Sequence, residues 1–395
     1  MSLRGSRAVA VALVSFAAFT DLVAYSIAVP VLPDLSRRFG ASPTMIGLLF
    51  AAFGVTLLGV SIPIGSVSDR MGRKRPLVGG LILLALATIL FAFADSLPWL
   101  FAARLAQGAA DAVTWVVGFA LIADLYGPAE RGRVMGFVMS GTSFGLMIGP
   151  SLGGWLYETG GMKLPFLTVA GFAALAAIGF MWLRLPDVHA SREAVPLGRL
   201  LRVRAVAICA LAVVVAASTV AMLEPAMSLW LSLDLGLNPS RVGVVFGVAA
   251  VAATALHPVF GRLSDRWSGR RLTMIGLVVT ALVMPLLSRA WDFQSAIALY
   301  VLMGVALALV VTPSLAFMAE ATSAAGVESF GVSYGVYNFA WGLGLLTGPA
   351  IGGFLFELLG FARLTLIWMP VVLATTILLA WKSAEKTRVP IGGGS

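Results

Sequence analysis

The sequence predicts an all-α membrane protein with twelve transmembrane helices, arranged as two six-helix halves. Three observations support this fold class: the composition, the number of long apolar segments and an internal repeat. Of the 395 residues, 59% are hydrophobic and only 11% are charged, and the mean hydropathy is +0.98. A soluble domain is about 25% charged and cannot bury this much apolar surface. The composition therefore excludes a disordered chain, a nucleic-acid-binding protein and nearly every soluble enzyme.

Twelve apolar segments follow one another along the chain, separated by charged residues, proline or glycine. Each is long enough to cross a bilayer as a helix, and each is too long for a strand of a transmembrane barrel. The expected spans are 8–33, 44–68, 76–94, 99–125, 133–157, 165–184, 205–233, 241–263, 272–290, 294–320, 331–356 and 361–382.

The Lys and Arg residues indicate how these helices are oriented. With the N-terminus in the cytoplasm, 20 of the 27 basic residues fall in cytoplasmic segments, six fall in outer segments and Arg104 lies inside a span. Cytoplasmic loops carry an excess of Lys and Arg, so both termini are expected in the cytoplasm of a multi-pass inner or plasma membrane protein, bacterial in type. The first apolar segment is too long for a cleavable signal sequence, and none is expected.

Two pairs of similar segments reveal the internal repeat. GSVSDRMGRKR (65–75) resembles GRLSDRWSGRR (261–271) at an offset of 196, and GLMIGPSLGG (145–154) resembles GLLTGPAIGG (344–353) at an offset of 199. An offset of six spans preserves orientation, so the repeat is parallel. The predicted organisation is a first half (1–184), a cytoplasmic loop (185–204), a second half (205–390) and a short tail added by cloning (391–395).

The loop after the second span carries a specific signature. It reads G-x-x-x-D-R-x-G-R-K-R and includes Asp69, Arg70 and Arg73, with Asp265 in the repeated copy. By this signature the chain resembles the major facilitator superfamily of secondary transporters over almost its whole length. Acidic and basic residues at helix ends can form a charged latch that opens and closes as the halves rock, so a conformational role is expected for these four residues.

The fifth span contains a second signature, G-x-x-x-G-P-x-x-G-G, with a copy in the eleventh span. It resembles the motif of proton-coupled drug antiporters within the superfamily. Small residues at this spacing let helices approach closely, and proline kinks a helix. The residues expected to serve this conformational role are Gly145, Gly149, Pro150, Gly348 and Pro349.

Further segments resemble the vesicular amine transporters, which exchange protonated amines for protons. They are AMLEPAMSLW (221–230) and ARLAQG (103–108), and Asp21 in the first span also matches an acid of that family. The chain departs from that family at three positions, where Phe53, Ala308 and Asn338 replace a lysine and two acids. Asp111 is an acid that many relatives lack. The resemblance therefore implies a bacterial-type exporter of amines or drugs, with proton-handling residues placed differently.

Three acids lie deep inside predicted spans: Asp21, Asp111 and Glu224. A charged residue at the bilayer centre costs about 2.5–3.5 kcal/mol on insertion scales, so each acid is expected to face a cavity and to bind a proton or a cationic substrate. The competing interpretation is an acid that caps a kink or pairs with a base. Arg104 is the one deep base and cannot neutralise three acids; it is expected in proton transfer, in gating or in an ion pair.

Aromatic side chains at similar depths could contact a cationic ligand through their ring faces. The candidates are Tyr25, Trp115, Trp230, Tyr334 and Trp341. Asn338 shares one helical face with Tyr334 and Trp341, which favours the eleventh span as a cavity wall. Ordinary core packing is the competing interpretation for each ring. His257 could relay protons or could equally be a packed neutral histidine.

Together these features predict a secondary active transporter that exchanges protons for cationic or lipophilic amines or drugs by alternating access. The alternatives are a carrier of polyamines, sugars or other metabolites, and a receptor or scaffold that transports nothing. No enzymatic activity is expected: two matches to the G-x-S-x-G nucleophile motif (141–145 and 331–335) lie inside predicted membrane helices, where that motif cannot form its strand-to-helix turn. With one cysteine and two histidines no metal site is expected, and no cofactor is expected beyond the proton gradient as the source of energy. The expected partners are a small cation, protons and lipid, without nucleic acid, and the chain is expected to be a monomer.

Overall fold

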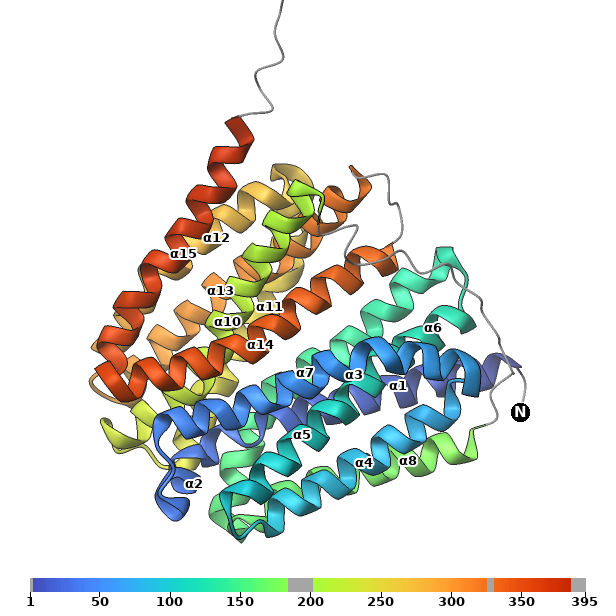
Figure 1. The fold of residues 1–395 in the computed structure, drawn as a ribbon, viewed down its shortest axis with the longest axis horizontal. Coiled ribbons are helices and arrows are strands. Elements are labelled where there is room, and N and C mark those ends of the chain that lie inside the picture. The colour runs from blue at the N-terminus through green and yellow to red at the C-terminus, as the bar shows by residue number, and fades with distance from the viewer. Residues whose placement is uncertain (1–2, 184–201, 325–329, 385–395) are drawn as a thin grey trace, which may run out of the picture.

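The computed structural model describes residues 3–183, 202–324 and 330–384, and these residues form a bundle of long helices (Figure 1). The first six spans comprise α1 (Leu3–Ser26), η1 (Val29–Val31), α2 (Leu32–Phe39), α3 (Pro43–Met71), α4 (Lys74–Phe93), α5 (Leu97–Val113), η2 (Thr114–Gly118), α6 (Phe119–Leu125), α7 (Pro128–Gly160) and α8 (Lys163–Trp182). The last six comprise α10 (Arg204–Leu233), α11 (Pro239–Trp267), α12 (Gly269–Val283), η3 (Met284–Arg289), α13 (Phe293–Ser323), α14 (Phe330–Leu359) and α15 (Phe361–Ala384).

Twelve helical spans in the described residues are long and apolar enough to cross a membrane, which confirms the predicted number. Most boundaries agree with the sequence within a few residues. The first span is longer than predicted: it continues through η1 and α2 to Phe39, beyond the prolines at positions 30 and 33. Proline can begin a new helical piece at its first turn, so it breaks this span into segments without ending it.

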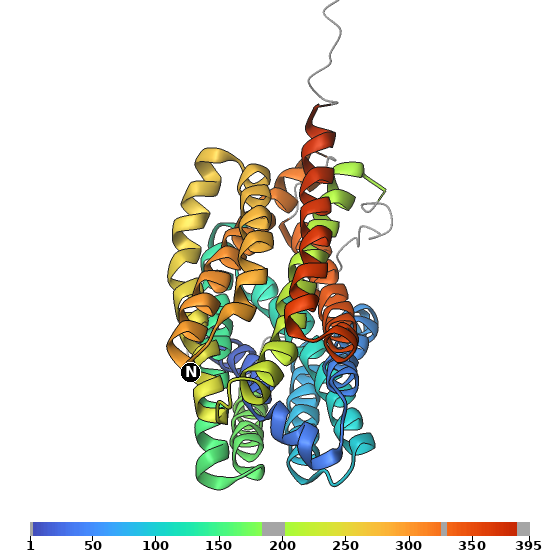
Figure 2. The same cartoon turned by 90° about the vertical axis from the view of Figure 1, so that its left-hand side faces the viewer.

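The first six spans and the last six form two groups of helices that lie side by side. Their ribbons meet at the end of the molecule where α2 lies and diverge toward the opposite end, as α3 and α14 show in Figure 1. Figure 2 looks at the α2 end, with the second group (yellow to red) above the first (blue to green). The main contacts between the groups join α3 with α14 and α7 with α11. The predicted loop 185–204 and the tail 391–395 lie largely or wholly outside the described residues.

The glycine motifs explain how the helices within each group approach so closely. A Cβ atom at Gly149 or Gly145 would collide with α1, against Ser26 and the carbonyl oxygen of Phe19. In the other group a Cβ atom at Gly348 would collide with the carbonyl oxygen of Ser218 on α10. Each motif helix therefore packs backbone to backbone against the first helix of its own group.

The same helices also cross to the opposite group. Gly154 on α7 lies against the carbonyl oxygen of Pro239, and Gly353 on α14 lies against that of Pro43. The carbonyl oxygens of the motif prolines, Pro150 and Pro349, lie in turn against glycines of α11 and α3. The motif helices thus join the two groups at the α2 end.

Candidate functional site

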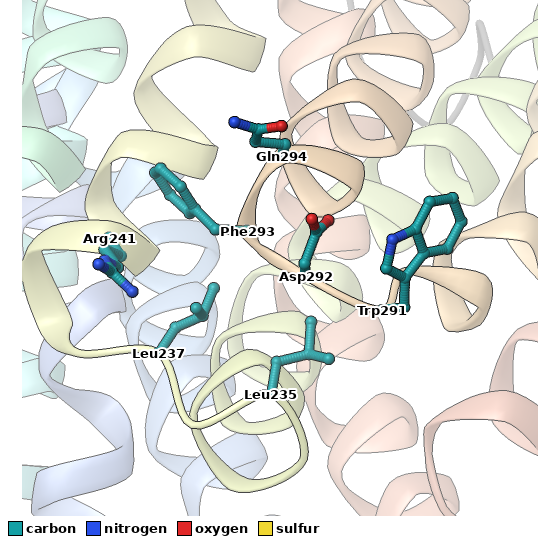
Figure 3. Close-up of a pocket in the computed structure, with 7 residues that line it drawn as sticks. All are labelled: Leu235, Leu237, Arg241, Trp291, Asp292, Phe293 and Gln294. Atoms are coloured by element: carbon teal, nitrogen blue, oxygen red, sulfur yellow. The ribbon is translucent and has the colours of Figure 1, made fainter.

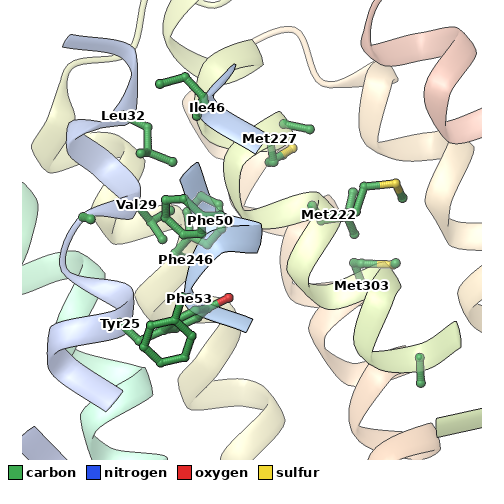
Figure 4. Packing of buried hydrophobic residues seen from close by; sticks show 14 of the residues in the cluster. Tyr25, Val29, Leu32, Ile46, Phe50, Phe53, Met222, Met227, Phe246 and Met303 are labelled. Carbon is green, nitrogen blue, oxygen red and sulfur yellow. The ribbon is translucent and has the colours of Figure 1, made fainter. Parts of the chain in front are cut away.

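A buried hydrogen bond joins the two groups of helices. The hydroxyl of Tyr25, on α1, donates to Oε2 of Glu224, on α10, at 2.5 Å, and both side chains are buried. The Tyr25 ring packs on Phe53 and Phe50 of α3, with ring centroids 5.2 and 5.9 Å apart (Figure 4). The first helix of each group is therefore joined through a carboxyl group set among aromatic rings.

Arg104 supplies the positive charge of this region. Its side chain, on α5, is 1% exposed, and its guanidinium lies over the rings of Phe50 and Phe91, 4.4 and 5.4 Å from the centroids. It donates one long hydrogen bond, 3.4 Å, to Oε1 of Gln107. Within the described residues its Nε and Nη2 have no hydrogen-bond partner. Its charge interacts electrostatically with Glu224 and Tyr25, so the sole deep base compensates Glu224 in part.

Asp21 and Asp111 form a second acidic group within the first six spans. Asp21, on α1, is 2% exposed, and neither of its carboxyl oxygens has a hydrogen-bond partner among the described residues. It interacts electrostatically with Asp111 and with the hydroxyl of Thr114. Asp111, on α5, is 6% exposed and accepts a hydrogen bond at Oδ1 from Nε1 of Trp115, at 3.1 Å. Two carboxyl groups so placed resist being ionised together, because each charge repels the other.

The fourth span changes its winding immediately after this acid. Residues Thr114–Gly118 (η2) form a π-helical segment between the α-helices α5 and α6. Such segments are rare and often occur at functional sites. No local sequence pattern predicts this segment: two valines and a glycine in TWVVG weaken an α-helix but do not identify a π-helix.

A row of aromatic rings leads from the acids to the other group of helices. Trp115 stacks on Phe119 with centroids 5.3 Å apart, and Phe119 stacks on Tyr334 of α14 at 5.8 Å. The Tyr334 hydroxyl lies 3.7 Å from the sulfur of Met139 and also interacts with Asn338, one turn along α14. Of the predicted aromatic residues, Trp115 and Tyr334 are thus brought together by a ring that the sequence analysis did not single out.

Two further tyrosines in the second group were not predicted. Tyr337 stacks on Trp341 at 6.2 Å, and its hydroxyl donates to the carbonyl oxygen of Val311 at 3.2 Å. Tyr300, on α13, interacts electrostatically with Glu224, and its ring packs edge-on against Phe246 at 4.7 Å. A lone tyrosine in an apolar span gives no sequence signal that separates a cavity wall from ordinary packing.

Trp230 and His257 each make a contact away from the bond between Tyr25 and Glu224. The Trp230 ring is buried and stacks on Phe361 of α15 at 4.8 Å, a packing contact within the last six spans. Nδ1 of His257 lies 2.6 Å from the hydroxyl of Thr312 on α13. Neither of these contacts involves Asp21, Asp111 or Glu224.

The charged loop after α3 forms a network around Arg73. Its guanidinium lies 2.5 Å from Asp69 and 2.8 Å from Asp124, and it donates to the Ser68 hydroxyl at 2.6 Å. Burial alone would lower the Arg73 pKa, but the hydrogen bonds and charges of Asp124 and Asp69 outweigh it and raise the pKa above its ordinary value. Asp124, at the end of the fourth span, was missed by the sequence analysis. Arg70 is exposed, and the side chain of Asp265, in α11, lies outside the described residues.

A shallow pocket of about 470 Å³ lies at the α2 end, between the loop that joins α10 to α11 and the start of α13 (Figure 3). Its lining residues are Leu235, Leu237, Arg241, Trp291, Asp292, Phe293 and Gln294. Asp292 is committed to capping α13: it accepts from the backbone N–H and the hydroxyl of Ser295, and these bonds lower its pKa. None of the three deep acids lines this pocket. Within the described residues, no cluster of three or more His, Cys, Asp or Glu side chains could hold a metal ion.

Comparison with known proteins agrees with this architecture. The profile described as Major Facilitator Superfamily matches residues 14–209 and again 209–394. The chain is 29% identical over 325 residues to the synaptic vesicular amine transporter of Homo sapiens, covering 82% of this chain and 63% of the relative. It is 29% identical over 373 residues to the probable vesicular acetylcholine transporter-B of Danio rerio, covering 89% of this chain and 75% of the relative. The chain thus spans less than two thirds of the length of the human relative.

Solved structures with similar folds are also transporters. One is a bacterial homologue of the human lysosomal transporter Spinster, in an inward-facing and unoccupied conformation. Its TM-score is 0.79 and its identity 15%, over 98% of this chain and 99% of that chain. Another is the human organic anion transporter MFSD10, with a TM-score of 0.69 and 19% identity, over 94% and 99% of the two chains. At these identities the likeness establishes the fold alone.

Proposed function

The chain belongs to the major facilitator superfamily of membrane transporters, and from that premise we propose that it exports cationic or lipophilic amines or drugs in exchange for protons, by alternating access. Members of this family are transporters and not enzymes. The single observation that carries the proposal is the burial of three acids, Asp21, Asp111 and Glu224, inside the membrane spans, with the charge of Arg104 acting on Glu224.

The balance of charge in the centre requires a mobile cation. Arg104 can compensate one carboxylate, and it interacts with Glu224. Asp21 and Asp111 interact chiefly with each other. An uncompensated carboxylate in a dry interior is costly, so each acid must either hold a proton or face a positive charge. A proton and a protonated amine both meet this requirement, and competition between them is sufficient for exchange.

The surrounding side chains suit an organic cation. Aromatic rings of the first six spans lie near the acids: Tyr25, whose ring packs on Phe53, bonds to Glu224, and Trp115 bonds to Asp111. An ammonium over an aromatic face gains about 0.5–2 kcal/mol, more when water is excluded. A site of acids and rings favours a lipophilic amine over a neutral sugar.

Alternating access is supported by the arrangement of the two groups of helices. They meet at the α2 end and diverge at the other end, where α3 ends and α4 begins (Figure 1). Arg73 lies between these two helices. The proposed cycle rocks residues 1–184 against residues 205–390 around the central acids. Because the loops at the Arg73 end carry an excess of basic residues, we propose that this end faces the cytoplasm and that the protein lies in a bacterial inner membrane. We propose a monomer as the working unit.

A polyamine carrier is the second candidate, favoured by the supply of more than one buried carboxyl group. A dication could engage Glu224 and the Asp21–Asp111 group together. This candidate differs from the first in substrate alone, so ligand competition separates the two.

The proposal is tested with purified protein reconstituted into liposomes. Tetraphenylphosphonium is the probe for a lipophilic cation, with spermidine as the polyamine, glucose as the neutral metabolite and an internal pH dye reporting protons. We expect cation uptake to follow the pH gradient and to move protons in the opposite direction. Binding should tighten between about pH 5 and 8.5 as protons leave the acids. Uptake of glucose alone, or a pH-independent affinity, would contradict the proposal.

Charge selectivity identifies the residues. Asp21→Asn and Glu224→Gln should each weaken the cation by about 1–3 kcal/mol, or roughly 5–150-fold, because each removes a charged contact. A neutral analogue of equal size should keep its affinity. If both contact one cation, the double variant should lose less than the sum of the single losses. Asp95→Asn, at an exposed acid in the loop before α5, is the matched control. Equal loss of charged and neutral ligands in folded protein would make the acids structural.

A further inference from the structure

Two glutamates cross between the groups of helices at the α2 end. Glu158, near the end of α7, accepts a hydrogen bond at Oε1 from the backbone N–H of Ser240, at 3.1 Å. Glu357, near the end of α14, accepts one at Oε2 from the backbone N–H of Thr44, at 3.0 Å. One glutamate comes from each group, and each binds the start of a helix in the other group. We call these two contacts the outer clamps.

The outer clamps are the same contact made twice by the internal repeat. Glu158 and Glu357 are 199 residues apart, which is the offset of the glycine–proline motifs that they follow. Thr44 and Ser240 are 196 residues apart, which is the offset of the charged loops. The repeat therefore places both the carboxylate and its acceptor helix twice, so that the first group holds the second and the second holds the first.

The acceptor helices leave a backbone group for each carboxylate to bind. The first N–H groups of a helix have no partner within it. Both α3 and α11 begin with proline, which has no N–H, and their caps Ser42 and Asn238 satisfy the third residue of the helix. The N–H of the second residue remains, and the glutamate of the opposite group takes it. The partial positive charge of a helix N-terminus favours this carboxylate.

The clamps lie beside the closest approach of the two groups. Gly154, four residues before Glu158, lies against the carbonyl oxygen of Pro239, which is adjacent to Ser240. Gly353, four residues before Glu357, lies against the carbonyl oxygen of Pro43, adjacent to Thr44. Both glutamates remain exposed to solvent, so water can replace the helix N–H groups when the helices part. Each clamp is thus a bond that can be released without burying a charge.

We propose that Glu158 and Glu357 are a matched pair of positioning residues that hold the outer end of the transport pathway closed. Each carboxylate is a removable cap on a helix of the opposite group. The inference rests on the proposed alternating access, in which both bonds break when the outer end opens and form again when it closes. A charge at a helix N-terminus has a modest effect, so loss of one clamp should shift the equilibrium toward the open outer end by about two- to fivefold. Loss of both should shift it by about three- to thirtyfold.

The labelling rate of a buried cysteine measures this equilibrium directly. Cys209 is the one cysteine of the chain and is buried, so Cys209→Ala gives a background without thiols. Val29→Cys then places a reporter at a buried position next to α10, where the Val29 carbonyl accepts from Ser228 at 2.6 Å. A membrane-impermeant maleimide is applied from the outer side. We expect Glu158→Ala and Glu357→Ala to raise the labelling rate by similar factors, and the double variant to raise it further.

Two controls keep this result specific. Asp95→Ala removes an exposed acid from the same end of the molecule without touching a clamp, and it should leave the labelling rate unchanged. Glu158→Gln and Glu357→Gln keep an acceptor oxygen but remove the charge, so they should fall between parent and alanine variants. An unchanged rate in the folded double variant would overturn the proposal. So would an equal increase in Asp95→Ala, or an effect of only one glutamate.

Binding and exchange in the same proteins separate this inference from the proposed function. The clamps do not touch the buried acids. The affinity for tetraphenylphosphonium at high pH should therefore change by no more than the factor by which the labelling rate changes. The rate of exchange should change together with the labelling rate. If the parent protein exchanges no cation for protons, the proposed function fails, whatever the labelling shows. If the parent exchanges normally and the double variant labels like the parent, the clamps alone fail.

Discussion

The two copies of the charged loop, after α3 and after α11, differ in the residue that holds their centre. In the first copy the Arg73 guanidinium lies between Asp69 and Asp124. In the second copy the equivalent position, 196 residues later, is Gly269. Its backbone N–H lies 3.4 Å from Oε1 of Glu320, the counterpart of Asp124. At this position the first loop has a guanidinium between two carboxylates, whereas the second has a backbone N–H that donates to a carboxylate.

The backbone around these positions is nearly the same in both copies. Gly72 has φ +77° and its counterpart Ser268 has φ +76°, the one positive φ found at a non-glycine residue in the described chain. The following basic residue also plays the same part twice. Lys74 donates to the carbonyl oxygen of Leu183 at 2.7 Å, and Arg270 donates to that of Leu379, again 196 residues later. In each copy a basic side chain satisfies a carbonyl at the end of the sixth or twelfth span.

The repeat therefore preserves the backbone of the two loops, while the charged side chain of Arg73 is present in the first loop and absent from the second. There is no room for a side chain at Gly269, where a Cβ atom would lie 2.7 Å from the backbone of Pro313 and of Phe317. The second loop is thus closed by tight packing, and the first by charges that can separate. The centre of the molecule is similarly unequal, because Asp21 and Asp111 both belong to the first six spans and Glu224 alone to the last six.

The largest effect is expected from removing the guanidinium of the first loop. Arg73→Ala leaves the buried carboxylate of Asp124 without that partner, and breaking a buried ion pair costs about 3–5 kcal/mol. Thermal unfolding in detergent should show a clear loss of stability. Arg70→Ala, an exposed neighbour in the same loop, should stay within about 0.5 kcal/mol of the parent. Equal losses in the two variants would mean that the network does not stabilise the loop.

A smaller effect is expected from adding a methyl group to the second loop. Gly269→Ala forces a Cβ atom against the backbone of α13, and overpacking of this kind costs about 1–3 kcal/mol. Gly79→Ala on α4 is the control, because nothing lies within 4 Å of the added atom. That change should be neutral or stabilising by up to about 1 kcal/mol, since alanine favours a helix. If Gly269→Ala is as stable as Gly79→Ala, the second loop is not closed by packing.

The smallest change in stability, with an effect on rate, is expected at the exposed end of the network. The Asp69 side chain is 53% exposed, and exposed ion pairs contribute about 0.2–1 kcal/mol. Asp69→Asn should therefore slow exchange by up to about fivefold, while equilibrium binding at the distant acids stays close to that of the parent. Asp265→Asn should slow exchange less, because its loop has glycine in place of Arg73. A matching loss of binding in Asp69→Asn would point to misfolding instead.

The sequence predicted the spans well because each polar group placed in lipid costs free energy by itself, so the composition of a segment is enough to identify a span. For the same reason it pointed to Asp21, Asp111 and Glu224, all of which the structure buries. It did not predict which groups meet. The bond from Tyr25 to Glu224 joins residues 199 positions apart, and nothing local to either residue specifies the other.

The remaining differences have similar causes. Asp124 is a loop-end acid in the sequence and becomes a buried partner of Arg73 only through the packing of two spans. Trp230 shares the apolar surroundings of the other aromatics, and the presence of Phe361 on a neighbouring helix decides its contact. The π-helical winding after Asp111 is likewise marked by no short sequence pattern.

The π-helical turn divides the fourth span into two α-helical parts, α5 and α6. Asp111 lies just before the wide turn, and Phe119 and Asp124 lie after it on the same span. Each residue of an α-helix advances about 100° around the axis. Tightening the wide turn into an ordinary one would therefore swing Asp124 about the axis relative to Asp111. A change at the buried carboxyl pair would thus reach the salt bridge between Arg73 and Asp124 as a rotation of the end of the span.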